Sequence, residues 1–255
     1  MKILAQTRKD KIFEMLKEDG SVKVADLSRI FKVSEVTIRQ DLEKLEIDGL
    51  ITREHGGAFI NTIGMQVQNF ALANLINMDK KELIGKKAAG YIESGDTIIL
   101  DSGTTTTEIA KAIIDKRNIT VITNALNIVM LLGANPAINV ILTGGEFKAP
   151  TLSLTGQKAA DFFLGLHVDK LFLATAGISL KSGLTYPSLS DIAVKKAMIE
   201  AADKVYLVAD STKVGKSSLA SLGALSLIQY LITDSDITEK DKEIFKENEI
   251  DFIIA

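Results

Sequence analysis

The spacing of apolar residues changes along the chain, and this change predicts two parts with different architectures. Before residue 49 the apolar residues recur at helical spacing, which is typical of amphipathic helices. The expected helices span residues 8–18, 24–31 and 35–48. Residues 50–60 then alternate loosely around Gly56 and Gly57, a pattern that predicts a small hairpin.

From residue 97 onward, short apolar runs alternate with helical stretches. The expected strands span residues 97–100, 119–123, 138–143, 170–174, 205–209, 230–233 and 252–254. The expected helices span residues 79–92, 105–115, 125–132, 155–164, 190–202 and 238–248. This alternation predicts an α/β domain with a mainly parallel sheet, in which ligands bind outside the carboxyl ends of the strands.

Three short helices followed by a hairpin predict a winged helix-turn-helix, whose third helix enters the major groove of DNA. Ile38, Leu42 and Leu45 form the buried stripe of that helix, and Ser34 caps its start. The residues expected to contact DNA are Ser34, Glu35, Thr37, Arg39 and Gln40 on the third helix, with Arg53 and His55 in the hairpin. Arg39 could pair with guanine and Gln40 with adenine.

The charge of residues 1–60 leaves a second interpretation open. This part holds 11 Lys or Arg residues and 11 Asp or Glu residues, whereas DNA-binding domains are commonly basic. A small helical module for protein–protein contacts fits the same counts. A basic surface requires segregation of charge, with Lys23, Arg39, Lys44 and Arg53 on one side.

A turn rich in glycine and threonine, DSGTTTT at residues 101–107, follows the first expected strand of the sheet and opens a helix. Backbone N–H groups and the helix dipole at such a turn favour an anion, commonly a phosphate. The simpler alternative is that the threonines only cap the helix. The turn lacks the Gly-Lys-Ser/Thr ending of a nucleotide-binding P-loop.

Polar residues also follow other expected strands, and parallel strands bring their carboxyl ends to one edge. The residues expected at an effector site are Asp101, Ser102, Gly103, Thr104, Thr105, Thr106, Asn124, Gly144, Gly145 and Lys213. Residues 103–106 and the ammonium of Lys213 suit a phosphate dianion, while Asp101 and Asn124 suit sugar hydroxyls. For Lys213, the alternative is a solvated loop lysine.

The composition narrows the chemistry. The chain has 255 residues, of which 46% are apolar and 25% charged, with a net charge of −3, as in ordinary globular proteins. It has no Cys, which excludes disulfides, thiolate metal ligands and Cys nucleophiles. Two isolated histidines do not make a metal cluster, so neither metal nor cofactor is expected. Without a signal peptide or a membrane-spanning stretch, we expect a cytoplasmic protein with no membrane partner.

Two stretches of the first part, VSEVTIRQDLEKL at 33–45 and GLITREHGGA at 49–58, closely resemble the N-terminal signature of the DeoR/GlpR family. The second part resembles the effector domain of that family at DSGTT (101–105), TN (123–124), GGE (144–146), AVKKAM (193–198) and DSTKVG (210–215). The family usually has two arginines where this chain has Arg39 and Gln40, and often an arginine where it has Ala73.

The resemblance implies a bacterial transcription regulator, as a rule a repressor of sugar catabolism. It also implies an effector domain similar in fold to ribose-5-phosphate isomerase that senses a phosphorylated sugar or related metabolite. Residues 101–106 would hold the phosphate side of the effector and Lys213 would supply a cation. Asp191 and Lys195, in or beside the 193–198 match, would face the site.

We therefore expect residues 1–60 to bind a double-stranded operator, residues 61–78 to connect, and residues 79–255 to sense a phosphorylated sugar or polyol. The apolar character of 61–78 predicts packing on the second part or on another subunit, and we expect a homo-oligomer, dimer or tetramer. One alternative is a phosphosugar isomerase-like enzyme with a nucleic-acid-binding module and Glu146 or Asp101 as base. Another is an assembly module that uses 61–78.

Overall fold

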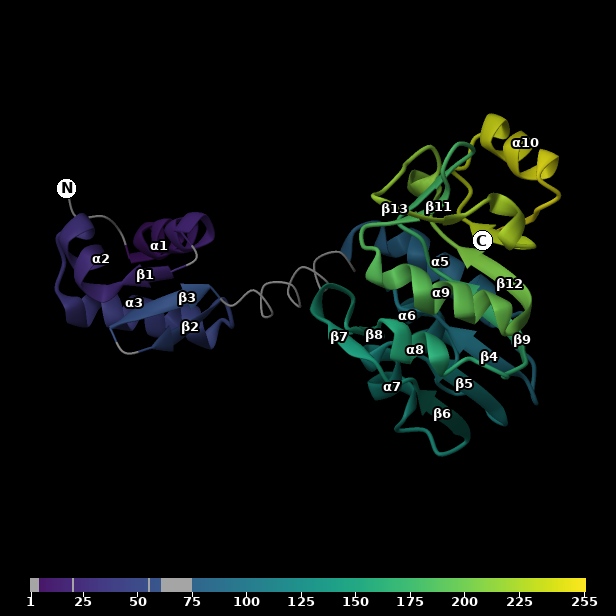
Figure 1. Ribbon diagram of the computed structural model, residues 1–255, viewed down its shortest axis with the longest axis horizontal. Helices are drawn as coiled ribbons and strands as arrows, with labels where there is room; N and C mark the ends of the chain where they lie inside the picture. Colours follow the sequence, from purple (N-terminus) through teal and green to yellow (C-terminus); the bar gives the residue numbers. More distant parts are fainter. Residues whose placement is uncertain (1–4, 20, 55, 61–74) are drawn as a thin grey trace. The chain divides into compact units, whose positions relative to one another are not determined.

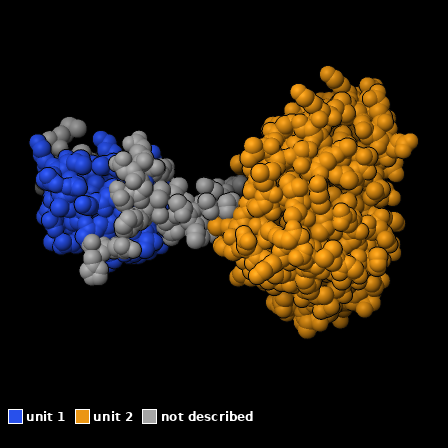
Figure 2. All heavy atoms as spheres, in the orientation of Figure 1, with its two compact units in different colours: residues 1–69 blue, residues 70–255 orange. Residues whose placement is uncertain are grey.

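The computed structural model describes residues 5–19, 21–54, 56–60 and 75–255. The chain divides into two compact units, residues 1–69 and residues 70–255 (Figure 2). Most of the expected connecting segment, residues 61–74, lies outside the described residues. Leu75 and Ile76, which follow it, are both 64% exposed.

The first unit is built from three helices and a three-stranded antiparallel sheet (Figure 1). Its elements are α1 (Ala5–Asp19), β1 (Ser21–Lys23), α2 (Val24–Phe31), α3 (Glu35–Ile47), β2 (Ile51–Glu54) and β3 (Gly57–Ile60). The expected hairpin is β2 and β3, and β3 also pairs with β1, a strand that the sequence pattern did not predict. The unit is a winged helix-turn-helix.

The core of this unit forms where the helices turn their apolar stripes inward. Ile38, Leu42 and Leu45 of α3 are buried as expected, together with Ile12, Leu16 and Leu27 from the other helices. Ser34 caps α3, because its Oγ accepts a hydrogen bond of 3.2 Å from the Thr37 amide. A buried ion pair joins α1 to α3, with Arg8 Nε 2.5 Å from Asp41 Oδ2.

The second unit is organised around a seven-stranded parallel sheet with strand order β15-β14-β12-β9-β4-β5-β6 (Figure 1). Its strands are β4 (Thr97–Leu100), β5 (Ile119–Thr123), β6 (Ile138–Leu142), β9 (Val168–Leu173), β12 (Ala202–Val208), β14 (Tyr230–Thr233) and β15 (Asp251–Ile254). All seven stretches were expected as strands, and the mainly parallel α/β architecture is confirmed.

Helices cover both faces of this sheet. They are α5 (Met78–Ala89), α6 (Thr104–Ala112), α7 (Leu126–Leu132), α8 (Gln157–Asp161), α9 (Ser190–Glu200) and α10 (Glu239–Glu247). Side chains of β4 alternate between the faces: Ile98 and Leu100 pack with Ile84 and Ile109 from α5 and α6, whereas Ile99 belongs to the core beneath α8, α9 and α10.

The structure adds short strands that the sequence pattern did not predict. They are a hairpin, β7 (Glu146–Lys148) and β8 (Ser153–Thr155), and a small antiparallel sheet of β10 (Gly177–Ser179), β11 (Gly183–Tyr186) and β13 (Ala220–Gly223). The expected helix at 155–164 is therefore wrong at its start: Thr155 ends β8, and Gly156, with φ of 85°, separates it from α8.

Candidate functional site

The exposed face of α3 carries the residues expected to meet DNA. Glu35 and Arg39 form an ion pair of 2.8 Å on this face, and Gln40 is exposed beside them. Ser34 and Thr37 lie at the start of the helix, with their hydroxyl oxygens 2.9 Å apart. Sequence reasoning missed Val36, whose side chain is 60% exposed at the same end of the helix.

The wing is tied to the far end of α3 by Arg53. Its Nε lies 2.6 Å from Glu46 Oε2, and its backbone N–H donates to Glu46 Oε1 at 2.9 Å. The hydrogen bond from the Arg53 backbone N–H and the weaker effect of the Arg53 side-chain hydrogen bond hold the pKa of Glu46 below its usual value. His55, the other wing residue expected to contact DNA, lies outside the described residues.

The turn from β4 into α6 places Gly103 at the N-cap of the helix. A Cβ on Gly103 would lie 2.8 Å from the Cβ of Ala174, so this close approach to the end of β9 requires glycine. Thr106 and Thr107 donate their hydroxyl protons back to the Gly103 carbonyl, at 3.0 and 2.6 Å. No side chain in the described part of the chain caps the helix, so the amides of its first turn are available to an anion.

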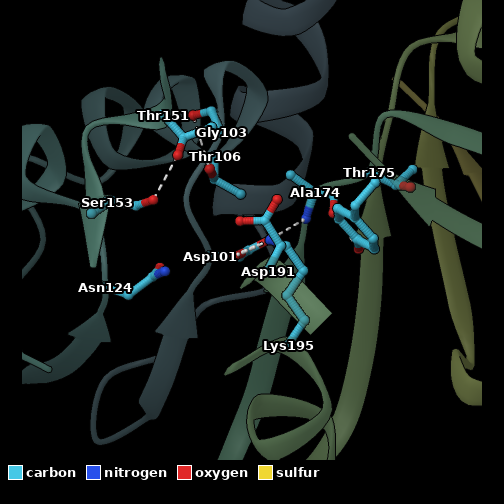
Figure 3. A network of polar contacts seen from close by, with 12 residues as sticks. Asp101, Gly103, Thr106, Asn124, Thr151, Ser153, Ala174, Thr175, Asp191 and Lys195 are labelled. Carbon is cyan, nitrogen blue, oxygen red and sulfur yellow. Dashed lines mark hydrogen bonds and ion pairs between the residues drawn. The ribbon is translucent and has the colours of Figure 1, made fainter. Parts of the chain in front are cut away.

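Asp101 and Lys195 form a buried ion pair at the foot of this turn (Figure 3). Lys195 Nζ lies 2.6 Å from both carboxylate oxygens, and Ala174 N–H donates to Asp101 Oδ2 at 3.1 Å. Burial raises the pKa of the Asp101 carboxyl, and the ammonium of Lys195 opposes that rise. Asp101 was expected to meet sugar hydroxyls, but its carboxylate is occupied by Lys195 and Ala174.

A second ion pair connects the β7–β8 hairpin to α9, the helix that carries Lys195. Lys148 Nζ lies 2.5 Å from Asp191 Oδ2, and Asp191 stands one turn before Lys195 on α9. Asp191 therefore contacts the β7–β8 hairpin, and Lys195 contacts the turn between β4 and α6. Both loops belong to the rim, which is the edge of the sheet where the strands have their carboxyl ends. The hydroxyl oxygens of Thr151 and Ser153, in the hairpin, lie 2.7 Å apart. Figure 3 shows these two residues on the same side of the site as Gly103 and Thr106.

Asn124 joins the end of β5 to the hairpin. Its side-chain Nδ2 donates to the Leu154 carbonyl at 2.9 Å, and its backbone carbonyl accepts from the Leu154 backbone amide at 2.8 Å. Its buried Oδ1 has no hydrogen-bond partner among the residues that the structure describes. Gly144 and Gly145 lie exposed at the base of the hairpin, and Gly145, with φ of 132°, passes close to the Thr155 carbonyl.

Lys213 closes a short turn, Ser211–Lys213, that follows β12 at the same edge of the sheet. Asp210 caps this turn through its Oδ1, which accepts from the Thr212 amide at 3.1 Å. Its Oδ2 is buried, and no partner for it lies in the part of the chain that is described. The ammonium of Lys213 makes no hydrogen bond or ion pair with the described residues.

The expected effector residues thus fall into two groups. Asp101, Ser102, Gly103, Thr104, Thr105, Thr106, Asn124, Gly144 and Gly145 follow the three neighbouring strands β4, β5 and β6, while Lys213 follows β12, which β9 separates from β4. Sequence reasoning did not single out Lys81, Lys148, Thr151 and Ser153. No local pattern marks Lys148, whose ammonium meets Asp191 only through tertiary packing, or Lys81, which is buried near Asp210 and Lys213.

Within residues 5–19, 21–54, 56–60 and 75–255, no three His, Cys, Asp or Glu side chains are grouped so that they could hold a metal ion. No helix in the described parts of the chain combines the length and apolar character needed to cross a membrane.

A winged helix-turn-helix in one unit and a polar strand-end rim in the other define the class of ligand-sensing transcription regulators. The chain matches the DeoR-like helix-turn-helix domain over residues 8–63 and the DeoR C terminal sensor domain over residues 76–235. It belongs to the DeoR family of DNA-binding transcriptional regulators. It is therefore a regulator and not an enzyme, and the isomerase interpretation is set aside.

Curated relatives agree in length as well as in sequence. The HTH-type transcriptional regulator GolR of Listeria innocua is 35% identical, covering 94% of this chain and 93% of that protein. The transcriptional repressor AccR of Agrobacterium fabrum is 37% identical, covering 90% of each. The glycerol-3-phosphate regulon repressor of Escherichia coli is 31% identical, covering 89% of this chain and 90% of that protein.

Similarity to solved structures is weaker. Ribose 5 phosphate isomerase A from Neisseria gonorrhoeae is 13% identical, with a TM-score of 0.40 over 55% of this chain and 54% of that chain. eIF2B delta from Chaetomium thermophilum is 18% identical, with a TM-score of 0.44 over 63% and 57%. Scores this low carry no functional inference.

Proposed function

We propose that this regulator represses a carbohydrate catabolic operon and that a phosphorylated sugar or polyol controls its binding to DNA. The observation that carries the proposal is the uncapped first turn of α6, which lies at the same edge of the sheet as the ammonium of Lys213. Backbone amides, a helix dipole and a cation together form an environment suited to a phosphate monoester.

The surrounding residues suit the rest of such a ligand. Asn124 Oδ1 and Asp210 Oδ2 are buried acceptors without a partner among the described residues. A buried acceptor left unpaired is costly, and ligand hydroxyls would satisfy both. Asp101 has a different role in this proposal: it holds Lys195 in place at the foot of the turn and does not contact the ligand.

The names of the relatives favour the same kind of signal. One is a glycerol-3-phosphate regulon repressor and another a putative aga operon transcriptional repressor. By analogy, we propose repression as the role of this chain. We also propose that it acts as a homo-oligomer, because operators recognised by helix-turn-helix proteins commonly mirror the symmetry of a dimer.

On the DNA side, we propose that Arg39 and Gln40 read bases while Ser34, Thr37 and Arg53 position α3 on the phosphates. Glu35 holds the guanidinium of Arg39 in the absence of DNA. Glu35 could itself accept a hydrogen bond from the N4 amino group of cytosine. Binding should weaken as salt rises, with a log–log slope of about −0.9 for each phosphate neutralised.

A thermal-shift panel tests the sensor. Glycerol 3-phosphate, hexose phosphates and pentose phosphates would be compared with their unphosphorylated parents. A ligand at roughly 100 times its Kd adds about 2.7 kcal/mol to stability, and this should raise the melting temperature by several degrees. We expect one phosphorylated compound to do so in the wild type and not in Lys213→Ala. If no phosphorylated compound raises it, the proposed sensing function is wrong.

A further inference from the structure

Lys81 is a buried lysine that the sequence pattern did not single out. It lies on α5, and only 4% of its surface is exposed. Lysine is rarely buried to this extent without a specific reason, because its ammonium loses hydration. Burial therefore lowers the pKa of Lys81. The charged groups that act on it are Asp210, Lys213 and Glu108, from the β12 turn and from α6.

The start of α5 is fastened to the turn that carries Lys213. Asn77, at the N-cap of α5, donates through Nδ2 to Asp210 Oδ1 at 3.3 Å. Lys80 Nζ lies 2.9 Å from Asp234 Oδ1 and 3.1 Å from Ser211 Oγ. These contacts place the first turn of α5 at the carboxyl edge of the sheet, where α6 also begins.

Helix α5 packs closely against α6 at one glycine, Gly85. A Cβ on Gly85 would lie 2.7 Å from the backbone carbon of Glu108, so the two backbones touch there. Both helices begin at the same edge of the sheet and run the same way. Lys81 lies four residues, about one turn, before Gly85 on α5, and Thr104 lies four residues before Glu108 on α6. Lys81 is therefore level with Thr104, the first residue of α6.

Asp210 supplies an independent sign that a ligand belongs here. Its Oδ2 is buried and has no hydrogen-bond partner among the described residues, although its carboxylate is near enough to act on Lys81. A ligand hydroxyl could donate to this oxygen. Glu108 is already paired with Lys111 at 2.8 Å. Lys81, Lys213 and Asp210 thus leave one net positive charge beside the positive end of the α6 dipole.

We propose that Lys81 is a ligand-binding residue whose ammonium, together with that of Lys213, holds the phosphate of a phosphorylated polyol at the first turn of α6. The inference rests on the proposed sensing function and adds a residue from a different helix. Because α5 directly follows the connecting segment, an occupied site contacts the first helix of the sensor unit. Ligand binding and the connection to the DNA-binding unit then share one helix.

The test compares Lys81→Met and Lys81→Gln with Lys86→Met, an exposed lysine on the same helix. Inorganic phosphate is the probe, against chloride at equal ionic strength, with thermal shift of the full chain as the readout. We expect Lys81→Met and Lys81→Gln to bind phosphate roughly tenfold to a hundredfold more weakly, as for a lost charged hydrogen bond. Lys86→Met should bind like the wild type.

Melting without phosphate separates a binding role from a structural one. Removing the ammonium of Lys81 takes away a charge that acts on the buried carboxylates of Asp210 and Glu108, so the melting temperatures of both variants without phosphate are compared with that of the wild type. If both melt lower and still bind phosphate as the wild type does, Lys81 is structural and the inference is wrong. If Lys213→Ala loses phosphate binding while both Lys81 variants keep it, the inference fails and the proposed function stands. No response of the wild type to phosphate or to the sugar-phosphate panel overturns both.

Discussion

The ammonium of Lys195 lies 2.6 Å from both carboxylate oxygens of Asp101, and 94 residues separate the two in sequence. Both side chains are almost completely buried, and Lys195 also lies 4.7 Å from the centre of the Tyr186 ring. The pair fixes α9 to the turn that opens α6. It thereby sets the position of the amides that we propose to bind phosphate.

Removing one member of this pair should be strongly destabilising. Lys195→Met leaves the Asp101 carboxylate buried without a counter-charge, which costs about 3–5 kcal/mol. Urea unfolding of the full chain measures the loss, with the exposed neighbour Lys196→Met as control. The double variant Asp101→Asn with Lys195→Met should recover much of the loss. A cost below about 1 kcal/mol for Lys195→Met would show that the pair contributes little.

Acid should weaken the contact between α5 and the strand ends. Burial opposes ionisation of Asp234, but hydrogen bonds from the Ser211 amide, Lys80 and the Ser211 hydroxyl outweigh it, so the pKa of Asp234 is lowered. A carboxyl with a lowered folded pKa stabilises the protein above its unfolded pKa. This contribution is lost as pH falls through the folded pKa, that is, below about 4.

Asp234→Asn tests that dependence. The variant should be less stable at neutral pH by about 1–3 kcal/mol, as for lost hydrogen bonds to a charged group. It should also lose stability less steeply than the wild type below about pH 4. The exposed Asp203→Asn is the matched control. Parallel acid-unfolding curves for the wild type and Asp234→Asn would contradict the assignment.

Arg39→Ala should affect DNA binding and not folding. The pair that Arg39 forms with Glu35 is exposed, and such pairs contribute roughly 0.3–0.5 kcal/mol. A base contact by arginine is worth about 1–3 kcal/mol of discrimination. Fluorescence anisotropy with operator and unrelated DNA should therefore show a loss of preference while the unfolding midpoint hardly moves. Equal weakening on both DNAs would instead make Arg39 a phosphate contact.

Gly85→Ala should force α5 away from α6. The added Cβ would meet the backbone of Glu108 at 2.7–2.9 Å, and such overpacking costs about 1–3 kcal/mol. Gly144→Ala is the matched control, because nothing lies within 4 Å of the Cβ that it would add. Denaturant unfolding compares the two. If the two variants proved equally stable, α5 and α6 could separate at no cost.

The sequence allowed the parallel sheet to be predicted because its strands are continuous apolar runs between helical stretches. Strands β7, β8 and β10 escaped prediction since each has three residues and leaves no periodic pattern. The positions of the proposed site residues were predictable where they follow a strand, as at Gly103 and Asn124, and their role in binding stays a prediction. The partner of Asp101 was not predictable from pattern, because only tertiary packing brings Lys195 to it. The surroundings of Lys81 were not predictable for the same reason, because its position in a helical pattern does not reveal which charged groups pack around it.

Strand β3 is the middle strand of its sheet, and this position has a mechanical consequence for the DNA-binding unit. A Cβ on Gly57 would lie 2.3 Å from the Val22 carbonyl oxygen, so the wing is pressed against β1, while Arg53 clips it to α3. We therefore expect the wing and α3 to move together as one rigid body. Under the proposed function, an effector would then change where this unit binds on DNA and not the shape of its DNA-binding surface.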